Sequence, residues 1–83
     1  MNEADIRTVT LATLQSIAPE VEVDALRSDR PLRRQVDLDS MDWLNFLLGL
    51  NKKLDVEIPE ADYAKLATID DIVAYIGKKF SNT

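Results

Sequence analysis

The sequence contains no cysteine and no histidine among its 83 residues. Without cysteine there can be no disulfide framework and no thiolate metal site. Without either residue, the common zinc sites and the usual nucleophile–base pairs cannot be built. Paired carboxylates could still act as acid and base, but so small a domain has little room for a closed cleft that raises a carboxyl pKa. We therefore expect no metal site and no enzyme, and any reactive group has to come from outside the chain.

Long apolar runs and an excess of positive charge are also missing. No run approaches the roughly 18 residues of a membrane span, and residues 1–5 lack the basic start and apolar run of a signal peptide. We therefore expect no membrane span and a cytoplasmic protein. The net charge of −5 makes nucleic acid an unsuitable partner, because little neutralises its phosphates. It suits partners that present a basic patch.

The length and the pattern of the chain define the expected fold class. We expect residues 1–83 to form one small domain, which buries only about 60–65 % of its unfolded surface. No segment alternates in the manner of a strand bounded by hairpin turns. The prediction is an all-α four-helix bundle with three longer helices, a short third helix, and a long loop between the first and second helices.

Residues 2–17 are predicted to form the first helix, with Asn2 as N-cap and Pro19 ending it. Residues 18–38 show no sustained period, and so long a connection is usually functional or tied down by packing. It is also the most basic part of the chain, with Arg27, Arg30, Arg33 and Arg34. These arginines are either a solvated loop that answers acidic neighbours or a contact for an anion, such as a cofactor phosphate, or for a partner enzyme.

Residues 40–54 are predicted to form the second helix, which has two apolar surfaces. One is a core face about 100° wide, made of Trp43, Phe46, Leu47, Leu50 and Leu54. The other is a ridge of Met41, Leu44 and Leu48. The polar side is assigned to Asp42, Asn45, Gly49, Lys52 and Lys53. The ridge is either buried against the long loop or free to contact a partner or substrate.

Two further helices follow in the prediction. The turn Glu57-Ile58-Pro59-Glu60 leads into the short third helix, with Pro59 at its first position. Thr68 and Asp71 have the spacing of a capping box at the start of the fourth helix. The buried stripe of that helix consists of Ile69, Ile72, Val73, Ile76 and Phe80.

Three carboxylates flank one serine in Asp37-Leu38-Asp39-Ser40-Met41-Asp42. Asp39 or Ser40 can cap the second helix, and one interpretation is that the pair is only an N-cap. A phosphate ester on Ser40 would also suit the positive end of this helix. A calcium loop is excluded, because its glycine position would be Asp42 and its final glutamate position Leu48.

The segment Asp39-Ser40-Met41-Asp42, the amphipathic stretch after it and Asp55-Val56-Glu57-Ile58-Pro59 together resemble the acyl carrier protein family. The resemblance continues through residues 69–76 and extends more loosely to the N-terminus. In that family the motif serine carries 4′-phosphopantetheine through a phosphodiester, which implies that Ser40 is the attachment site. The resemblance further implies a non-catalytic carrier, which holds acyl or aminoacyl groups as thioesters and delivers them to successive enzymes.

The same resemblance implies roles for the residues around Ser40. Asp39 would help the phosphopantetheinyl transferase to bind its metal ion, and Met41 and Leu44 would be apolar contacts beside the arm. Acyl-transferring or acyl-modifying enzymes with basic patches would dock on the acidic side chains Asp37, Asp42, Glu57 and Glu60. Leu48 completes the expected partner surface. Residues 37–71 carry nine acidic and three basic side chains, a net charge of −6, which suits such docking.

One feature departs from the family pattern. Carriers of fatty acid synthesis usually have a run of glutamates along the second helix, where this chain has Asn45, Asn51, Lys52 and Lys53. This departure predicts a specialised carrier, and partners that steer on an acidic helix should bind it weakly. The absence of Gly-Gly before the motif favours an acyl or aminoacyl carrier over a peptidyl one.

We expect a freestanding protein, because Met1 is present and the set of predicted helices is complete. We also expect a monomer. Fatty acid biosynthesis, other lipid metabolism and polyketide biosynthesis are the pathways that the resemblance implies. The alternative function is a helical protein-interaction module without a prosthetic group, recruited through the ridge of Met41, Leu44 and Leu48.

Overall fold

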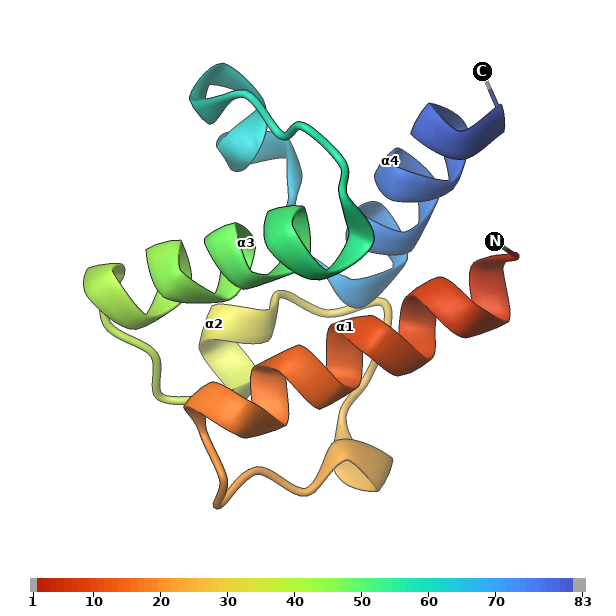
Figure 1. Cartoon of the computed structure of the whole chain (residues 1–83). Coiled ribbons are helices and arrows are strands. Elements are labelled where there is room, and N and C mark those ends of the chain that lie inside the picture. Colours follow the sequence, from red (N-terminus) through yellow and green to blue (C-terminus); the bar gives the residue numbers. More distant parts are fainter. Residues whose placement is uncertain (1, 82–83) are drawn as a thin grey trace.

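Three long helices dominate the computed structural model, which describes residues 2–81 (Figure 1). The elements in chain order are α1 (Glu3–Ile17), η1 (Val23–Ala25), α2 (Leu32–Gln35), α3 (Ser40–Leu54), η2 (Glu60–Lys65) and α4 (Ile69–Ser81). The two η elements are 3-10 helices. Between residues 2 and 81 the only β-type pairing is an isolated bridge of Pro31 with Thr68. The predicted all-α fold with three longer helices is confirmed.

The helix α1 packs against both α3 and α4. The three helices form the core with Ile6, Leu14, Phe46, Leu47, Leu50, Leu54, Ile69, Ile72, Val73 and Ile76. Of the stripe predicted for the last helix, Phe80 is only half-buried. Two buried threonines of α1 need no partner from another helix. The hydroxyls of Thr10 and Thr13 donate to the carbonyls of Ile6 and Val9, each at 2.7 Å, so their burial leaves no polar group unsatisfied.

Helix boundaries follow the predicted capping residues. Asn2 accepts a hydrogen bond from the amide of Asp5 at 2.8 Å. Thr68 and Asp71 exchange reciprocal bonds of 2.9 and 3.2 Å before α4. At the C-terminal end of α3, Asp55 adopts a left-handed conformation with φ of 51°, which stops the helix. The starts of α1 and α4 are therefore set by their own sequence.

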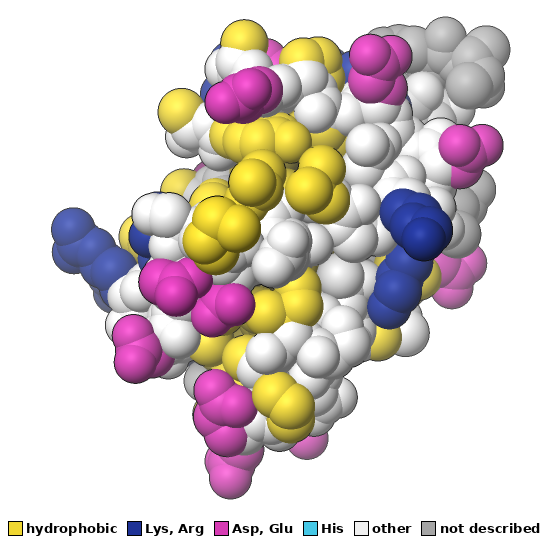
Figure 2. Space-filling view, turned by 60° about the vertical axis from the view of Figure 1, so that its left-hand side comes forward, with side chains coloured by type: hydrophobic (Ala, Val, Ile, Leu, Met, Phe, Trp, Pro, Cys, Tyr) yellow, Lys and Arg dark blue, Asp and Glu magenta, His cyan; other side chains and the backbone are white. Residues whose placement is uncertain are grey.

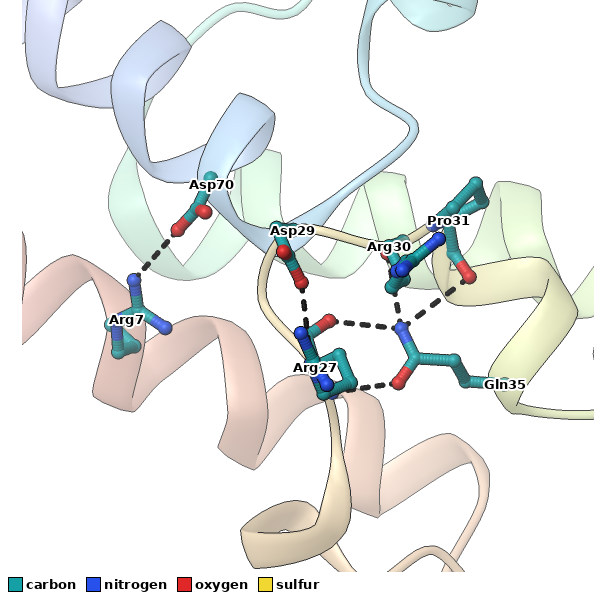
Figure 3. Close-up of polar contacts among 7 residues, drawn as sticks. All are labelled: Arg7, Arg27, Asp29, Arg30, Pro31, Gln35 and Asp70. Carbon is teal, nitrogen blue, oxygen red and sulfur yellow. Dashed lines mark hydrogen bonds and ion pairs between the residues drawn. The ribbon is translucent and has the colours of Figure 1, made fainter.

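One glutamine side chain organises the long connection between α1 and α3 (Figure 3). The Oε1 atom of Gln35 accepts from the amide of Arg27 at 2.7 Å. Its Nε2 atom donates to the carbonyls of Arg27 at 2.9 Å and Arg30 at 3.0 Å. Since Gln35 belongs to the short helix α2, these bonds fold the segment before α2 back onto it. Neither α2 nor this role of Gln35 was predicted from the sequence.

Backbone and apolar contacts then attach the same connection to the bundle. Leu32, Val36 and Leu38 are buried. The amide of Leu32 donates to the carbonyl of Ala67 at 2.9 Å, and the amide of Asp70 donates to the carbonyl of Ser28 at 3.0 Å. The connection is therefore tied down by packing, as its length suggested.

Two local predictions were wrong. Gly49 was assigned to the polar side of α3, but it faces α1, and a Cβ atom built on it would lie 3.0 Å from Cγ2 of Thr13. Pro59 was placed at the first position of the short third helix, but it precedes that helix, which is the 3-10 helix η2. Glycine suits either side of a helix, and the close approach of α1 shows that this one lies on the inner side. Proline suits the position before a helix as well as its first position, and it takes the former here.

The 3-10 helix η2 is joined to α4 by a polar contact. The hydroxyl of Tyr75 donates to Oδ2 of Asp62 at 2.5 Å, and Nζ of Lys65 lies 3.3 Å from Oδ1 of the same carboxylate. The hydrogen bond from Tyr75 lowers the pKa of Asp62. Burial, followed by the bond to Asp62, raises the pKa of Tyr75 to about 12. The folded state therefore favours a charged Asp62 and a neutral Tyr75.

The contact of Gly49 with Thr13 predicts a coupled effect on stability. In a helix interior alanine is more stable than glycine by about 1 kcal/mol. At position 49, however, the new Cβ atom would press on Cγ2 of Thr13, which is held in place by the hydroxyl bond to Val9. We expect Gly49→Ala to stabilise the Thr13→Ser variant more than the wild type, by about 1 kcal/mol. Urea unfolding of the four proteins measures this coupling. An equal gain in unfolding free energy in both backgrounds would show that α1 shifts to accommodate the added Cβ atom without cost.

The shifted pKa of Tyr75 predicts a loss of stability in alkaline solution. A phenol whose pKa is raised on folding stabilises the protein fully below its unfolded pKa, and this contribution disappears as the pH rises through the folded value. Between pH 10 and about 12, wild-type stability should therefore fall more steeply than that of Tyr75→Phe. Unfolding free energies measured at intervals over this range test it. If the unfolding free energies of the two proteins fall in parallel with pH, the pKa of Tyr75 is not raised in the folded state.

Candidate functional site

The Ser40 hydroxyl lies at the start of α3, and Asp39 is the N-cap of that helix. The Asp39 backbone is extended, and its Oδ1 atom accepts from the amide of Asp42 at 2.8 Å. The sequence left the cap open between Asp39 and Ser40, and the structure selects Asp39. Ser40 is therefore the first residue of a 15-residue helix. Its side chain is exposed, and its hydroxyl has no hydrogen-bond partner between residues 2 and 81.

The apolar ridge of Met41, Leu44 and Leu48 lies on the solvent side of α3. These side chains are 65 %, 36 % and 46 % exposed, respectively. Burial of the ridge against the long loop, one of the two interpretations of the sequence, is therefore wrong. Trp43 is half-buried and packs on Phe46, with ring centroids 5.3 Å apart. Trp43 thus belongs to the core side, as predicted, and the ridge does not.

Acidic side chains accompany this ridge on the surface. Asp37 and Asp39 are exposed and Asp42 is half-buried, so the start of α3 gathers three carboxylates around Ser40. Figure 2 shows hydrophobic and acidic side chains next to one another on one face of the molecule. Glu57 and Glu60 are also exposed, but they follow α3 in the chain. No hydrogen bond or ion pair joins them to the Ser40 group in the described part of the chain.

The four arginines of the long connection are exposed. Nε of Arg27 lies 3.4 Å from Oδ1 of Asp29, as Figure 3 shows. In the range 2–81 none of the four forms an ion pair with Asp37, Asp39 or Asp42. The interpretation of a solvated loop with an acidic neighbour therefore holds for Arg27, and the carboxylates around Ser40 remain available to another molecule.

A cleft of about 300 Å³ lies within the long connection, between residues 20–26 and residues 35–37. Its lining residues are Glu20, Val21, Glu22, Ala25, Leu26, Gln35, Val36 and Asp37. Asp37 links the cleft to the segment that carries Ser40. Nothing in the sequence indicated this cleft. Val21, Leu26 and Val36 are apolar residues spaced irregularly along the connection, and such a pattern does not reveal where a folded loop leaves space.

The chemistry available at the site is that of an exposed primary hydroxyl. A phosphodiester on Ser40 fits the start of α3, because the free amides and the dipole of a helix N-terminus favour an anion. Within residues 2–81 no group of three or more Asp or Glu side chains is arranged to hold a metal ion. None of the described helices is both long and apolar enough to cross a membrane. The exposed hydroxyl at the start of α3 suits covalent attachment of a group through Ser40.

Comparisons with known proteins agree with this chemistry. The family model described as "Phosphopantetheine attachment site" matches residues 10–76. The acyl carrier protein of Campylobacter jejuni serotype O:23/36 is 31 % identical over 72 residues, which are 87 % of each chain. That of Campylobacter hominis is 33 % identical over 72 residues, which are 87 % of this chain and 85 % of the relative.

A solved structure supports the same family. The solution structure of a candidate acyl carrier protein from Anaplasma phagocytophilum superposes with a TM-score of 0.84 at 26 % sequence identity. The match covers 95 % of this chain and 92 % of the other. The family model spans most of the chain, and the relatives and the fold agree with it. The chain therefore belongs to the acyl carrier protein family, and it functions as a carrier with a covalently attached 4′-phosphopantetheine arm.

Proposed function

We propose that Ser40 is the residue that carries the 4′-phosphopantetheine, through a phosphodiester on its Oγ atom. The observation that supports this most directly is the exposed hydroxyl at the first position of α3, which has no hydrogen-bond partner among residues 2–81. Asp39 takes over the capping bond, so the hydroxyl is not needed to stabilise the helix. Modification of Ser40 would then leave the start of α3 intact.

The bound arm supplies a terminal thiol, which the chain itself lacks because it contains no cysteine. The protein contributes the anchor at Ser40 and an N-terminal turn that favours the phosphate charge. One oxygen of Asp39 accepts from the amide of Asp42, and its other oxygen is available. We infer that this oxygen helps the phosphopantetheinyl transferase to hold its metal ion during modification. The chain acts as a carrier and does not catalyse.

The proposed partners are enzymes that transfer or modify acyl groups. They would dock with apolar contacts on Met41, Leu44 and Leu48, which are exposed beside the arm. Carboxylates at Asp37, Asp42, Glu57 and Glu60 would attract the basic patches of these enzymes. Tethering at Ser40 raises the effective concentration of the acyl group at a docked enzyme.

We further propose a specialised acyl or aminoacyl carrier rather than the general carrier of fatty acid synthesis. Lys52 and Lys53 in the last turn of α3 support this, because the resemblance implies glutamates along this helix in carriers of fatty acid synthesis. The proposal includes a cytoplasmic monomer in which residues 1–83 form one domain. An interaction module without a prosthetic group is not favoured, because the family match covers the phosphopantetheine attachment site.

Modification of Ser40 predicts a specific change of mass. Incubation with coenzyme A and a broad-specificity phosphopantetheinyl transferase should add one phosphopantetheine to the wild type. Ser40→Ala should gain nothing, and Ser16→Ala, which alters an exposed serine of α1, should be modified as the wild type is. Mass spectrometry of the intact proteins measures the gain. An unmodified wild type or a modified Ser40→Ala would refute the assignment.

The two proposed roles of Asp39 predict different results for two substitutions. Asp39→Ala removes the N-cap and should lower the unfolding free energy by about 1 kcal/mol, as urea unfolding would measure. Asp39→Asn can still accept the bond from Asp42, so its stability should stay near that of the wild type. Both variants should be modified more slowly, because both lack the carboxylate. If Asp39→Asn is modified at the wild-type rate, Asp39 serves only as a cap.

A further inference from the structure

The exposed ridge of α3 continues into a positive charge. Leu44, Leu48 and Lys52 are spaced by four residues, so they form one row along the helix. All three are exposed, whereas the opposite side of α3 is buried in the core. Lys52 therefore follows Leu48 as the next side chain of the same row. At 1.5 Å per residue, the row ends about 18 Å from Ser40 along the helix axis.

The two ends of α3 carry opposite charges. Asp37, Asp39 and Asp42 surround the start, and Lys52 and Lys53 lie in the last turn. Over residues 2–81 neither lysine forms an ion pair, since the pairs in this range involve Arg7, Arg27 and Lys65. Both lysines suit the helix dipole, but only Lys52 lies in the exposed row. Lys53 is turned about 100° around the helix from it.

We propose that the enzymes that take acyl groups from this carrier place an Asp or Glu side chain against Lys52. This inference rests on the proposed attachment of the arm at Ser40. The arm fixes which end of α3 lies nearest the active site of the partner enzyme. The partner surface would then be basic opposite the start of α3, apolar along the ridge, and acidic opposite its end. A partner that is basic along its whole docking groove would bring a like charge onto Lys52.

A protein surface fits this row better than a membrane or a nucleic acid does. Either of those would bring phosphates to both ends of α3, and the three carboxylates around Ser40 would repel them. A folded protein can place opposite charges about 18 Å apart, and such complementarity fixes the register of docking and excludes wrong partners. The carboxylate at Lys52 therefore acts as a specificity contact.

The first step of the test identifies the contact. The modified protein is mixed with a soluble extract of its source cells and treated with a carbodiimide, which joins amines directly to carboxylates. Mass spectrometry of the peptides should find Lys52 linked to an Asp or Glu of one enzyme. Links to Lys78, an exposed lysine of α4, serve as the background. Absence of a Lys52 link above this background would overturn the inference.

The second step measures docking to the purified enzyme. We expect Lys52→Glu to weaken binding about three- to tenfold at low salt, and reversal of the linked carboxylate to lysine should restore it. Lys53→Glu is the matched control, because it has the same charge change in the same helical turn, and it should have a smaller effect. Equal effects of the two variants, or no rescue, would overturn the inference.

Two further measurements separate the remaining outcomes. Phosphopantetheine loading of every variant is checked by mass before docking is measured. A wild type that takes no phosphopantetheine at Ser40 refutes the proposed function, whereas normal loading with unchanged docking of Lys52→Glu refutes only the present inference. Binding to phosphatidylglycerol vesicles that Lys52→Glu abolishes would assign the row to a membrane and overturn it as well.

Discussion

The packing of α3 against α1 is the constraint on which the other features of the site depend. At Gly49 the two helices come so close that a Cβ atom would lie 3.0 Å from Cγ2 of Thr13. That threonine is held by its own hydroxyl bond to Val9. With α3 placed in this way, Phe46, Leu50 and Leu54 enter the core, and the opposite side of the same helix faces the solvent.

This orientation divides α3 between two tasks. Its inner side contributes apolar burial, at about 25 cal/mol per Å² of surface removed from water. Its outer side keeps Met41, Leu44 and Leu48 exposed. Apolar side chains in water cost free energy that polar side chains at the same positions would not. Retention of such side chains beside Ser40 is what a docking surface for partner proteins requires. One helix thus stabilises the bundle and presents the proposed attachment site.

The long connection before α3 is the other element that positions Ser40. Gln35 folds its first part back through hydrogen bonds to Arg27 and Arg30, and Leu32, Val36 and Leu38 anchor its second part in the core. A buried Leu38 only two residues before Ser40 limits how far the start of α3 can move. Packing on the inner side of the chain thereby leaves the hydroxyl exposed on the outer side.

Much of this could be read from the sequence because the signals were local. The helix α3 begins and ends as predicted, since Asp39 and the amphipathic period act within a few residues. The same holds for Asn2 before α1 and for Thr68 with Asp71 before α4. The family motif around Ser40 is local as well, which is why the carrier function could be inferred before the fold was known.

What the sequence by itself determined was therefore the three long helices, the caps of α1 and α4, and the family motif. Only the tertiary structure decided that Met41, Leu44 and Leu48 stay exposed, that Gly49 faces α1, and that Asp39 rather than Ser40 caps α3. A helical period defines two apolar surfaces equally well, but it does not say which one another helix will cover. That choice depends on contacts between residues far apart in the chain, such as Gly49 with Thr13.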